Sequence, residues 1–122
     1  MDWPPEIGAA MPRATDAWCH EEKWARWILA ERGHGPEWLH VFGVGPEDWR
    51  QVWRAIRVAV KAVPVTEVRL SPDGVGCGVV VDLRIGPRRA TVLSAWHYSH
   101  RGAAPRLVTA YPTPYTRAHG HT

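Results

Sequence analysis

The sequence predicts an α+β fold, with two main N-terminal helices packed on a C-terminal antiparallel sheet of three to four strands. Three observations lead to this prediction. Apolar residues recur with a helical period in the first half of the chain and alternate with a period of two in the second half. Short turns join the alternating segments, which favours antiparallel pairing. Helical and extended segments are also segregated along the chain, which is typical of α+β domains.

A single domain is expected over residues 15–115, with an irregular lead-in at 1–14 and a flexible tail at 116–122. The chain of 122 residues is long enough to bury one core. Eight tryptophans stand against one phenylalanine. Because an indole buries a large apolar area, we expect a few tryptophans to supply much of this core.

Start and stop signals set the expected helices. Residues 16–32 carry apolar side chains on one helical stripe, and Gly33 is expected to end that helix. A short turn or helix is expected at 36–42. The clearest helix is expected at 46–63, where Pro46 fits the first helical position.

In the second half of the sequence, the alternating pattern predicts strands that are separated by turns rich in glycine and proline. In the second of these strands, Val79, Val81, Leu83 and Ile85 share one face, and we expect that face to pack on the helix at 46–63. The expected strands are 65–70, 77–85, 90–98 and 106–111.

Charge is distributed unevenly along the chain. The net charge is +3, yet no aspartate or glutamate follows Asp82, whereas arginines and histidines continue to the C-terminus. A basic surface on one side of a protein is typical of a partner that is rich in phosphate. RNA is therefore a suspected partner.

The sequence lacks the motifs that are typical of several functional classes. No segment is long and apolar enough for a membrane span, and no signal peptide is recognisable. We expect a cytoplasmic protein, or an effector delivered without a cleaved signal. Phosphate-binding loops, dinucleotide motifs and metal-ligand spacings are also missing, so neither a cofactor nor a metal is expected. Cys19 and Cys77 read as small apolar side chains, and whether they pair stays open.

His20 is the first candidate for chemistry. On a helix it lies between Trp24 and Trp27 on the apolar stripe, with Lys23 at the edge. An imidazole there either serves as a general base or acid or is a core histidine bonded to a backbone carbonyl. The sequence leaves both interpretations open.

The predicted sheet supplies further candidates. Arg106 suits a phosphate because its planar guanidinium donates two parallel hydrogen bonds. Thr109 and Tyr111 add hydroxyl donors, and Trp96 is suited to stacking on a base. Thr109 and Tyr111 also have a structural interpretation as residues that favour strands, and Trp96 has one as a core anchor. The candidate substrate-binding residues are Trp96, His97, Tyr111, Arg88 and Arg89.

Simple alternation places Arg106 and Thr109 on opposite faces of the last strand, since their positions differ by an odd number. Both reach one site only if the strand twists, bulges or ends near residue 106.

Two segments carry a resemblance to a known family. Residues 18–25 read WCHEEKWA, and residues 105–112 read PRLVTAYP. Together with the intervening tryptophan-containing helix, they resemble a family of small bacterial domains in which an early helix bears a histidine and a lysine, and a PRLVTAYP-like strand closes the sheet. That family is similar to C-terminal modules of polymorphic toxins and, more distantly, to the barnase–EndoU–colicin–RelE-like ribonucleases.

The resemblance implies a metal-independent ribonuclease-like domain that serves as a toxin or effector module and has a protein inhibitor or cognate partner. It implies His20 as base or acid, Lys23 and Arg106 as phosphate ligands, and Thr109 as a donor from the last strand. Two other classes remain open. One is a non-catalytic module that binds nucleic acid or protein through the basic sheet, and the other is an immunity or antitoxin-type partner.

Overall fold

A computed structural model describes residues 3–113, and it confirms the α+β prediction. Helices precede an antiparallel sheet of four strands. The predicted tail at 116–122 and the end of the predicted domain at 114–115 lie outside the described residues. The helices are α1 (Glu21–Lys23), α2 (Gly35–Phe42) and α3 (Trp49–Val60), and the strands are β1 (Glu67–Ser71), β2 (Gly74–Ile85), β3 (Arg88–Tyr98) and β4 (Arg106–Pro112).

The sheet is a meander in the order β1-β2-β3-β4, and each strand pairs with its neighbour in sequence. The longest ladder joins β2 to β3, from Val75 opposite Tyr98 to Ile85 opposite Arg88. Gly86 begins the turn of that hairpin with φ +60°, a conformation that glycine adopts without steric cost.

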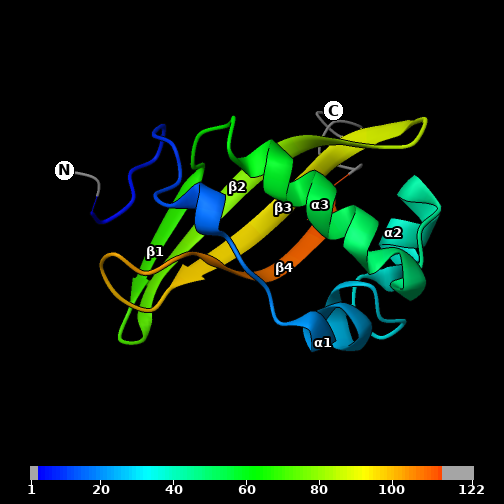
Figure 1. Cartoon of the computed structure of the whole chain (residues 1–122), viewed down its shortest axis with the longest axis horizontal. Coiled ribbons are helices and arrows are strands. Elements are labelled where there is room, and N and C mark those ends of the chain that lie inside the picture. The colour runs from blue at the N-terminus through cyan, green and yellow to red at the C-terminus, as the bar shows by residue number, and fades with distance from the viewer. Residues whose placement is uncertain (1–2, 114–122) are drawn as a thin grey trace.

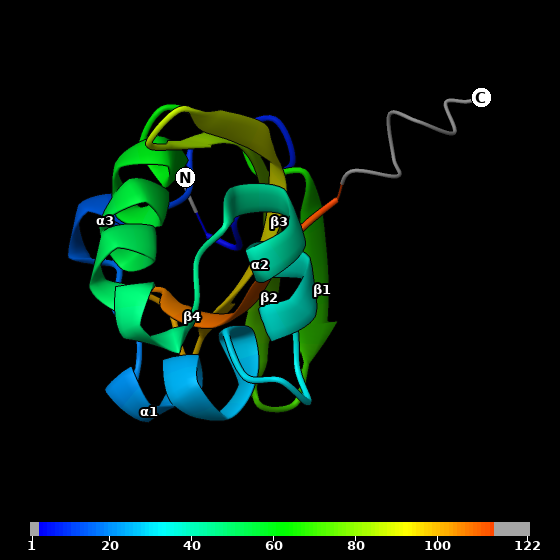
Figure 2. The same cartoon turned by 90° about the vertical axis from the view of Figure 1, so that its right-hand side faces the viewer.

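Helix α3 lies across one face of the sheet, which we call the inner face (Figures 1 and 2). It buries Val52, Ile56 and Val60, which are spaced four residues apart and therefore share one side of the helix. The facing residues of β2 are Val79, Val81, Leu83 and Ile85, all 6% exposed or less. The expected contact between this strand and the helix is confirmed. Trp49 and Trp53 pack at the margin of the core and are only partly buried.

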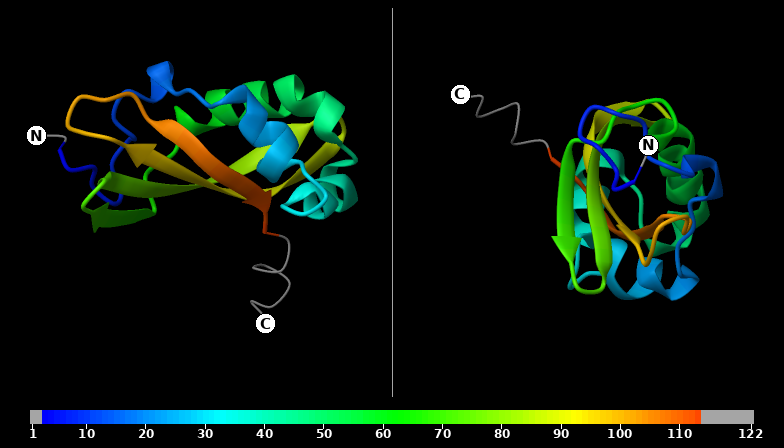
Figure 3. Two further views of the ribbon diagram at one scale, coloured as in Figure 1. Left: turned by 90° about the horizontal axis from the view of Figure 1, so that it is seen from below. Right: turned by 90° about the vertical axis from the view of Figure 1, so that its left-hand side faces the viewer.

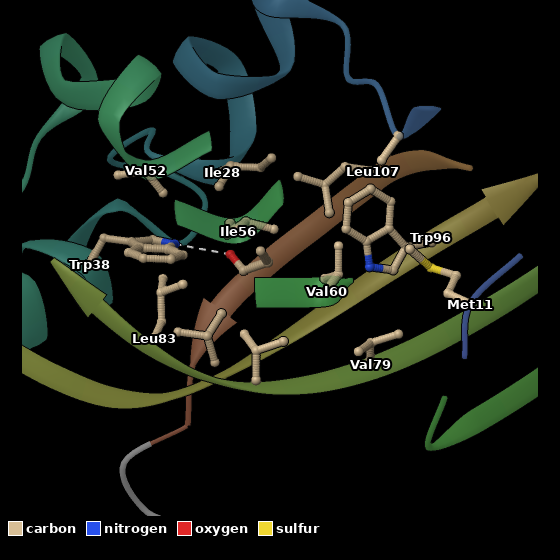
Figure 4. Packing of buried hydrophobic residues seen from close by; sticks show 14 of the residues in the cluster. Met11, Ile28, Trp38, Val52, Ile56, Val60, Val79, Leu83, Trp96 and Leu107 are labelled. Carbon is tan, nitrogen blue, oxygen red and sulfur yellow. Dashed lines mark hydrogen bonds between the residues drawn. The ribbon is translucent and has the colours of Figure 1, made fainter. Parts of the chain in front are cut away.

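Helix α2 covers the end of the core beside β3 and β4 (Figure 2). Pro36 fits its first turn, and Gly43 ends it with φ +70°. The Trp38 side chain is fully buried, stacks on Phe42 and donates a 3.0 Å hydrogen bond from Nε1 to the carbonyl oxygen of Ala110 (Figure 4). This bond satisfies the polar edge of a buried indole and ties α2 to β4.

The helix expected at 16–32 is wrong over most of its length. Residues 14–16 form one 3-10 turn, α1 is a single turn, and a π-helical turn follows at Trp24–Ile28. The helix does not begin at Asp16 because the next residues are extended and pair with β4. The Trp18 N–H donates to the carbonyl oxygen of Pro105, and the Leu107 N–H donates to that of Trp18. This parallel bridge places Trp18 opposite Arg106.

The helix also ends earlier than expected because the chain turns back sharply after Ile28. The backbone N–H of His34 donates to the carbonyl oxygen of Trp27. A Cβ at Gly33 would lie 1.9 Å from that oxygen, and a Cβ at Gly35 would lie 2.5 Å from the carbonyl oxygen of Ala30. The turn therefore requires glycine on both sides of His34.

Candidate active site

Three of the four predicted catalytic side chains line one hollow. His20, Lys23 and Arg106 surround a space of about 340 Å³, together with Glu22, Arg26 and Trp27. We call this space the His20 hollow. Neither Lys23 nor Arg106 forms an ion pair among the described residues, whereas Arg26 lies 3.9 Å from Glu22. The hollow therefore offers an imidazole and two cations without a carboxylate partner, which suits an anion.

The hollow forms where the N-terminal turns cross the beginning of β4. The Trp18–Arg106 bridge fixes the backbone just before His20, and α1 then carries Lys23 along the same side. Figure 3 shows this arrangement from below, with α1 and the turn after it lying beside β4. Trp18 packs edge-to-face on His20, with ring centroids 4.9 Å apart. His20 itself is exposed, so the alternative of a buried core histidine is wrong.

A β-bulge in β4 decides which side chains share a face. Ala95 pairs with Thr109, whereas its neighbour Trp96 pairs with Leu107, so Val108 is the extra residue between them. Arg106 pairs with His97 before the bulge. Since Ala95 and His97 lie on the same face of β3, the bulge places Arg106 and Thr109 together on the face away from α3, which we call the outer face. Simple alternation had separated them.

Thr109 lies in a second hollow on the outer face, not in the first. This groove, which we call the Thr109 groove, has a volume of about 270 Å³. Gly76 and Gly78 contribute to its lining from β2, Arg69 from β1, and Thr109 and Tyr111 from β4. The Oγ1 atom of Thr109 is buried and has no hydrogen-bond partner among the described residues. Arg106 and Thr109 pair with His97 and Ala95, which are two residues apart on β3, so their backbone positions lie about 7 Å apart along the sheet.

Cys19 lies beside the His20 hollow but is poorly suited to act as a nucleophile. Burial raises the pKa of its thiol to about 11, although Lys23 and Arg106 oppose this shift. Its Sγ is 3.4 Å from the carbonyl oxygen of His20 and 3.8 Å from that of Leu107. Because the thiolate is the reactive form, the thiol stays unreactive near neutral pH. Cys19 and Cys77 are both free.

The raised pKa values of the two buried thiols predict how the stability of the fold depends on pH. Burial raises the pKa of Cys19 and of Cys77 from 9.0 to about 11, so the folded protein keeps protons that the unfolded chain releases. The stabilisation is complete below pH 9 and is lost as the pH rises through 11. We expect urea midpoints to fall across this range. A C19A/C77A variant should lose only part of the slope, because burial also raises the pKa of Tyr98. A flat profile for the unsubstituted protein would contradict this prediction.

The prediction that Trp96 binds substrate is wrong. Its side chain is 1% exposed and lies on the inner face of β3 (Figure 4). Its Nε1 donates a 2.8 Å bond to Oγ of Ser94, which in turn donates to the carbonyl oxygen of Val79. These two hydrogen bonds satisfy the polar groups of Trp96 and Ser94 inside the core. Trp96 therefore anchors the core, and its ring is not available to stack on a base.

Arg88 and Arg89 are not at this site. They lie at the β2–β3 hairpin, whereas Arg106 pairs with His97 near the other end of β3. That places them about 30 Å from Arg106 along the strand. Arg89 pairs with Asp82 at 2.6 Å, and Arg88 reaches the carbonyl oxygens at the end of α2. His97 and Tyr111, by contrast, lie on the outer face with Arg106 and Thr109.

Sequence reasoning missed His34, which the structure places against the outer-face residues. Its Nδ1 lies 3.0 Å from Oε1 of Glu37, and its ring stacks on Tyr111 with centroids 4.6 Å apart. Trp27, which lines the His20 hollow, meets the same ring edge-to-face at 5.6 Å. The spacing His-x-x-Glu at the start of a helix was visible in the sequence, but the contact with Tyr111 was not.

Within residues 3–113, no group of three histidine, cysteine, aspartate or glutamate side chains is arranged to hold a metal ion. Likewise, no helix in that range has the length and apolar character needed to cross a membrane. A comparison of the sequence with known protein families finds no matching family model, and a search of curated proteins finds no matching protein.

Proposed function

We propose that the chain is a metal-independent RNA-cleaving domain of the ribonuclease-like class. The observation that carries this proposal is the joint lining of one hollow by His20, Lys23 and Arg106. These are the side chains to which the family resemblance gives the roles of acid or base and of phosphate ligands. Two flat side chains flank them, since Trp18 is 42% exposed and Trp27 is 44% exposed. Exposed indoles of this kind stack on unpaired bases.

The proposed reaction needs only groups that are present in RNA and in the chain. A base removes the proton from a ribose 2′-hydroxyl, and the resulting oxygen forms a bond to phosphorus. The bond from phosphorus to the 5′-oxygen then breaks, and an acid protonates that oxygen. The products are a 2′,3′-cyclic phosphate and a 5′-hydroxyl. Lys23 and Arg106 stabilise the additional negative charge that develops on the phosphate oxygens.

The test is incubation of the purified protein with total RNA in EDTA. We expect discrete fragments whose ends are 2′,3′-cyclic phosphates and 5′-hydroxyls. A DNA strand of the same sequence as one cleaved RNA is the matched control, because it lacks the 2′-hydroxyl and should stay intact. Intact RNA would overturn the proposal.

The same samples distinguish the non-catalytic alternative. RNA that binds but stays intact would favour a binding module that uses the outer face. Its affinity should then fall with salt, with a log–log slope of about −0.7 for each phosphate neutralised on a single strand. The toxin or effector role, and a cognate protein inhibitor, remain proposals that follow from the resemblance.

A further inference from the structure

We infer that the solvent-facing side of α3 is a second binding surface for a single nucleic-acid strand, and that it holds the part of the strand that flanks the His20 hollow. The inference rests on the proposed function in taking RNA as that strand. Four exposed cations, which we call the α3 stripe, lie on this side: Arg50, Arg54, Arg57 and, at the C-cap, Lys61. Their spacing places them on one side of the helix, over a length of about 16 Å.

The positive charge of the α3 stripe is not offset by carboxylates. The sequence contains no acidic residue between Asp48 and Glu67. Within residues 3–113, none of the four cations forms an ion pair. Together with Trp49, Trp53 and Val58 they line a space of about 420 Å³, which we call the α3 hollow and which has no acidic residue in its lining. Charge complementarity therefore favours a polyanion.

Two indoles beside the stripe favour a single nucleic-acid strand over other polyanions. The guanidinium carbon of Arg50 lies 4.6 Å from the centre of the Trp49 ring. That of Arg57 lies 5.6 Å from the centre of the Trp53 ring. Trp24 packs against both indoles, with ring centroids 6.2 Å and 6.0 Å away, so the core holds them in place. Unpaired bases stack on guanidinium planes and aromatic rings of this kind.

Shared lining residues connect the α3 hollow to the His20 hollow. Between them lies a middle hollow of about 390 Å³, which is lined by His20, Glu21, Glu22, Ala25 and Trp49. His20 also lines the His20 hollow, and Trp49 also lines the α3 hollow. Figure 2 shows α1 close to the start of α3. A strand whose reacting phosphate lies in the His20 hollow can therefore continue past Trp49 and along α3.

Two carboxylates in the middle hollow limit where the phosphates of this strand lie. Glu21 and Glu22 line that hollow, and Arg26 lies 3.9 Å from Glu22 on its other side, in the His20 hollow. Because like charges repel, we expect a sugar and a base beside Trp49 and the next phosphates against the α3 stripe.

The test measures binding of an all-deoxy single strand, which the proposed reaction cannot cleave, by fluorescence anisotropy at several salt concentrations. The variant R54Q/R57Q removes two charges from the α3 stripe and changes only exposed side chains. We expect its affinity at low salt to fall at least about tenfold, and its log–log slope to become shallower by about 0.7 for each charge removed. Arg50→Lys keeps the charge but removes the planar group, so it should weaken binding without changing the slope.

The matched control is R32Q/R89Q, which removes the same net charge from two exposed arginines outside the three hollows. Its slope should equal that of the unsubstituted protein. Equal losses of affinity and slope in R32Q/R89Q and R54Q/R57Q would show a general effect of net charge and overturn the inference.

Cleavage provides an independent measurement. On a long RNA, R54Q/R57Q should raise KM at unchanged kcat, because a contact remote from the reacting phosphate stabilises the ground state and the transition state equally. A dinucleotide is too short to reach the α3 stripe from the His20 hollow. Its cleavage should therefore be the same with R54Q/R57Q and with the unsubstituted protein, and an equal loss on both substrates would contradict the inference.

The outcomes separate this inference from the proposed function. If the unsubstituted protein cleaves RNA and R54Q/R57Q binds the deoxy strand with unchanged affinity and slope, the inference is overturned and the proposed function stands. If RNA stays intact but R54Q/R57Q loses affinity and slope, the proposed function is overturned and the α3 surface stands. Tighter binding to a duplex of the same sequence, or binding to vesicles of anionic lipid but not to the single strand, would overturn the inference.

Discussion

Replacing His20 with alanine is expected to lower RNA cleavage by about 10²- to 10⁴-fold, the usual contribution of a positioned acid or base. The thermal midpoint should shift by no more than about 2 °C, because substitutions of exposed residues seldom change stability by more than about 0.5 kcal/mol. The imidazole of His20 is exposed and forms no capping hydrogen bond with α1. Initial rates on a short RNA, with calorimetry on the same samples, measure both quantities.

The matched control for this prediction is His100→Ala, which removes an exposed histidine outside both hollows. It should leave the cleavage rate unchanged. If His20→Ala cleaves RNA as fast as the unsubstituted protein, His20 has no part in the chemistry.

Replacing Trp38 with alanine is expected to produce the largest loss of stability. The side chain is fully buried, stacks on Phe42 and donates a hydrogen bond to the carbonyl oxygen of Ala110. Truncating a buried tryptophan costs about 3–5 kcal/mol, which is a large fraction of the total stability of a domain of this size. Urea denaturation followed by circular dichroism measures this change in the free energy of unfolding.

A second variant, Trp38→Phe, keeps most of the apolar volume but removes Nε1, and it should cost less than the alanine substitution. Leu39→Ala provides the control on the same helix, because the Leu39 side chain is 61% exposed. Equal effects of Trp38→Ala and Leu39→Ala would contradict the packing described for α2.

The main elements of the fold follow from local sequence patterns. Alternating valines place β2 correctly, and the apolar spacing after Pro46 identifies α3. The first helix could not be predicted correctly, because two long-range constraints override the local pattern. Trp18 pairs with β4, and the backbone after Ile28 turns back onto Trp27. Helical propensity contains no information about either contact.

For the site, too, the residue types could be predicted from the sequence, whereas features that depend on long-range packing could not. His20 and Arg106 were identified from residue type and Lys23 from the family resemblance, and the structure brings all three to one hollow. The bulge at Val108 was raised as a condition, but no feature of the sequence places it there. Alternation grouped Trp96 with Ser94 correctly, but it did not decide that their face is the buried one. Deciding between the two faces requires knowing where α3 packs.

The bridge between Trp18 and Arg106 has a consequence for the growing polypeptide. The side chains of the His20 hollow come from residues 20–27 and from Arg106, and these leave the ribosome far apart in time. Both backbone partners of Trp18 belong to Pro105 and Leu107, so a nascent chain that stops short of β4 cannot build the hollow. The RNA cleavage that we propose can therefore begin only after β4 has been made, which protects the messenger and the ribosome through the earlier part of synthesis.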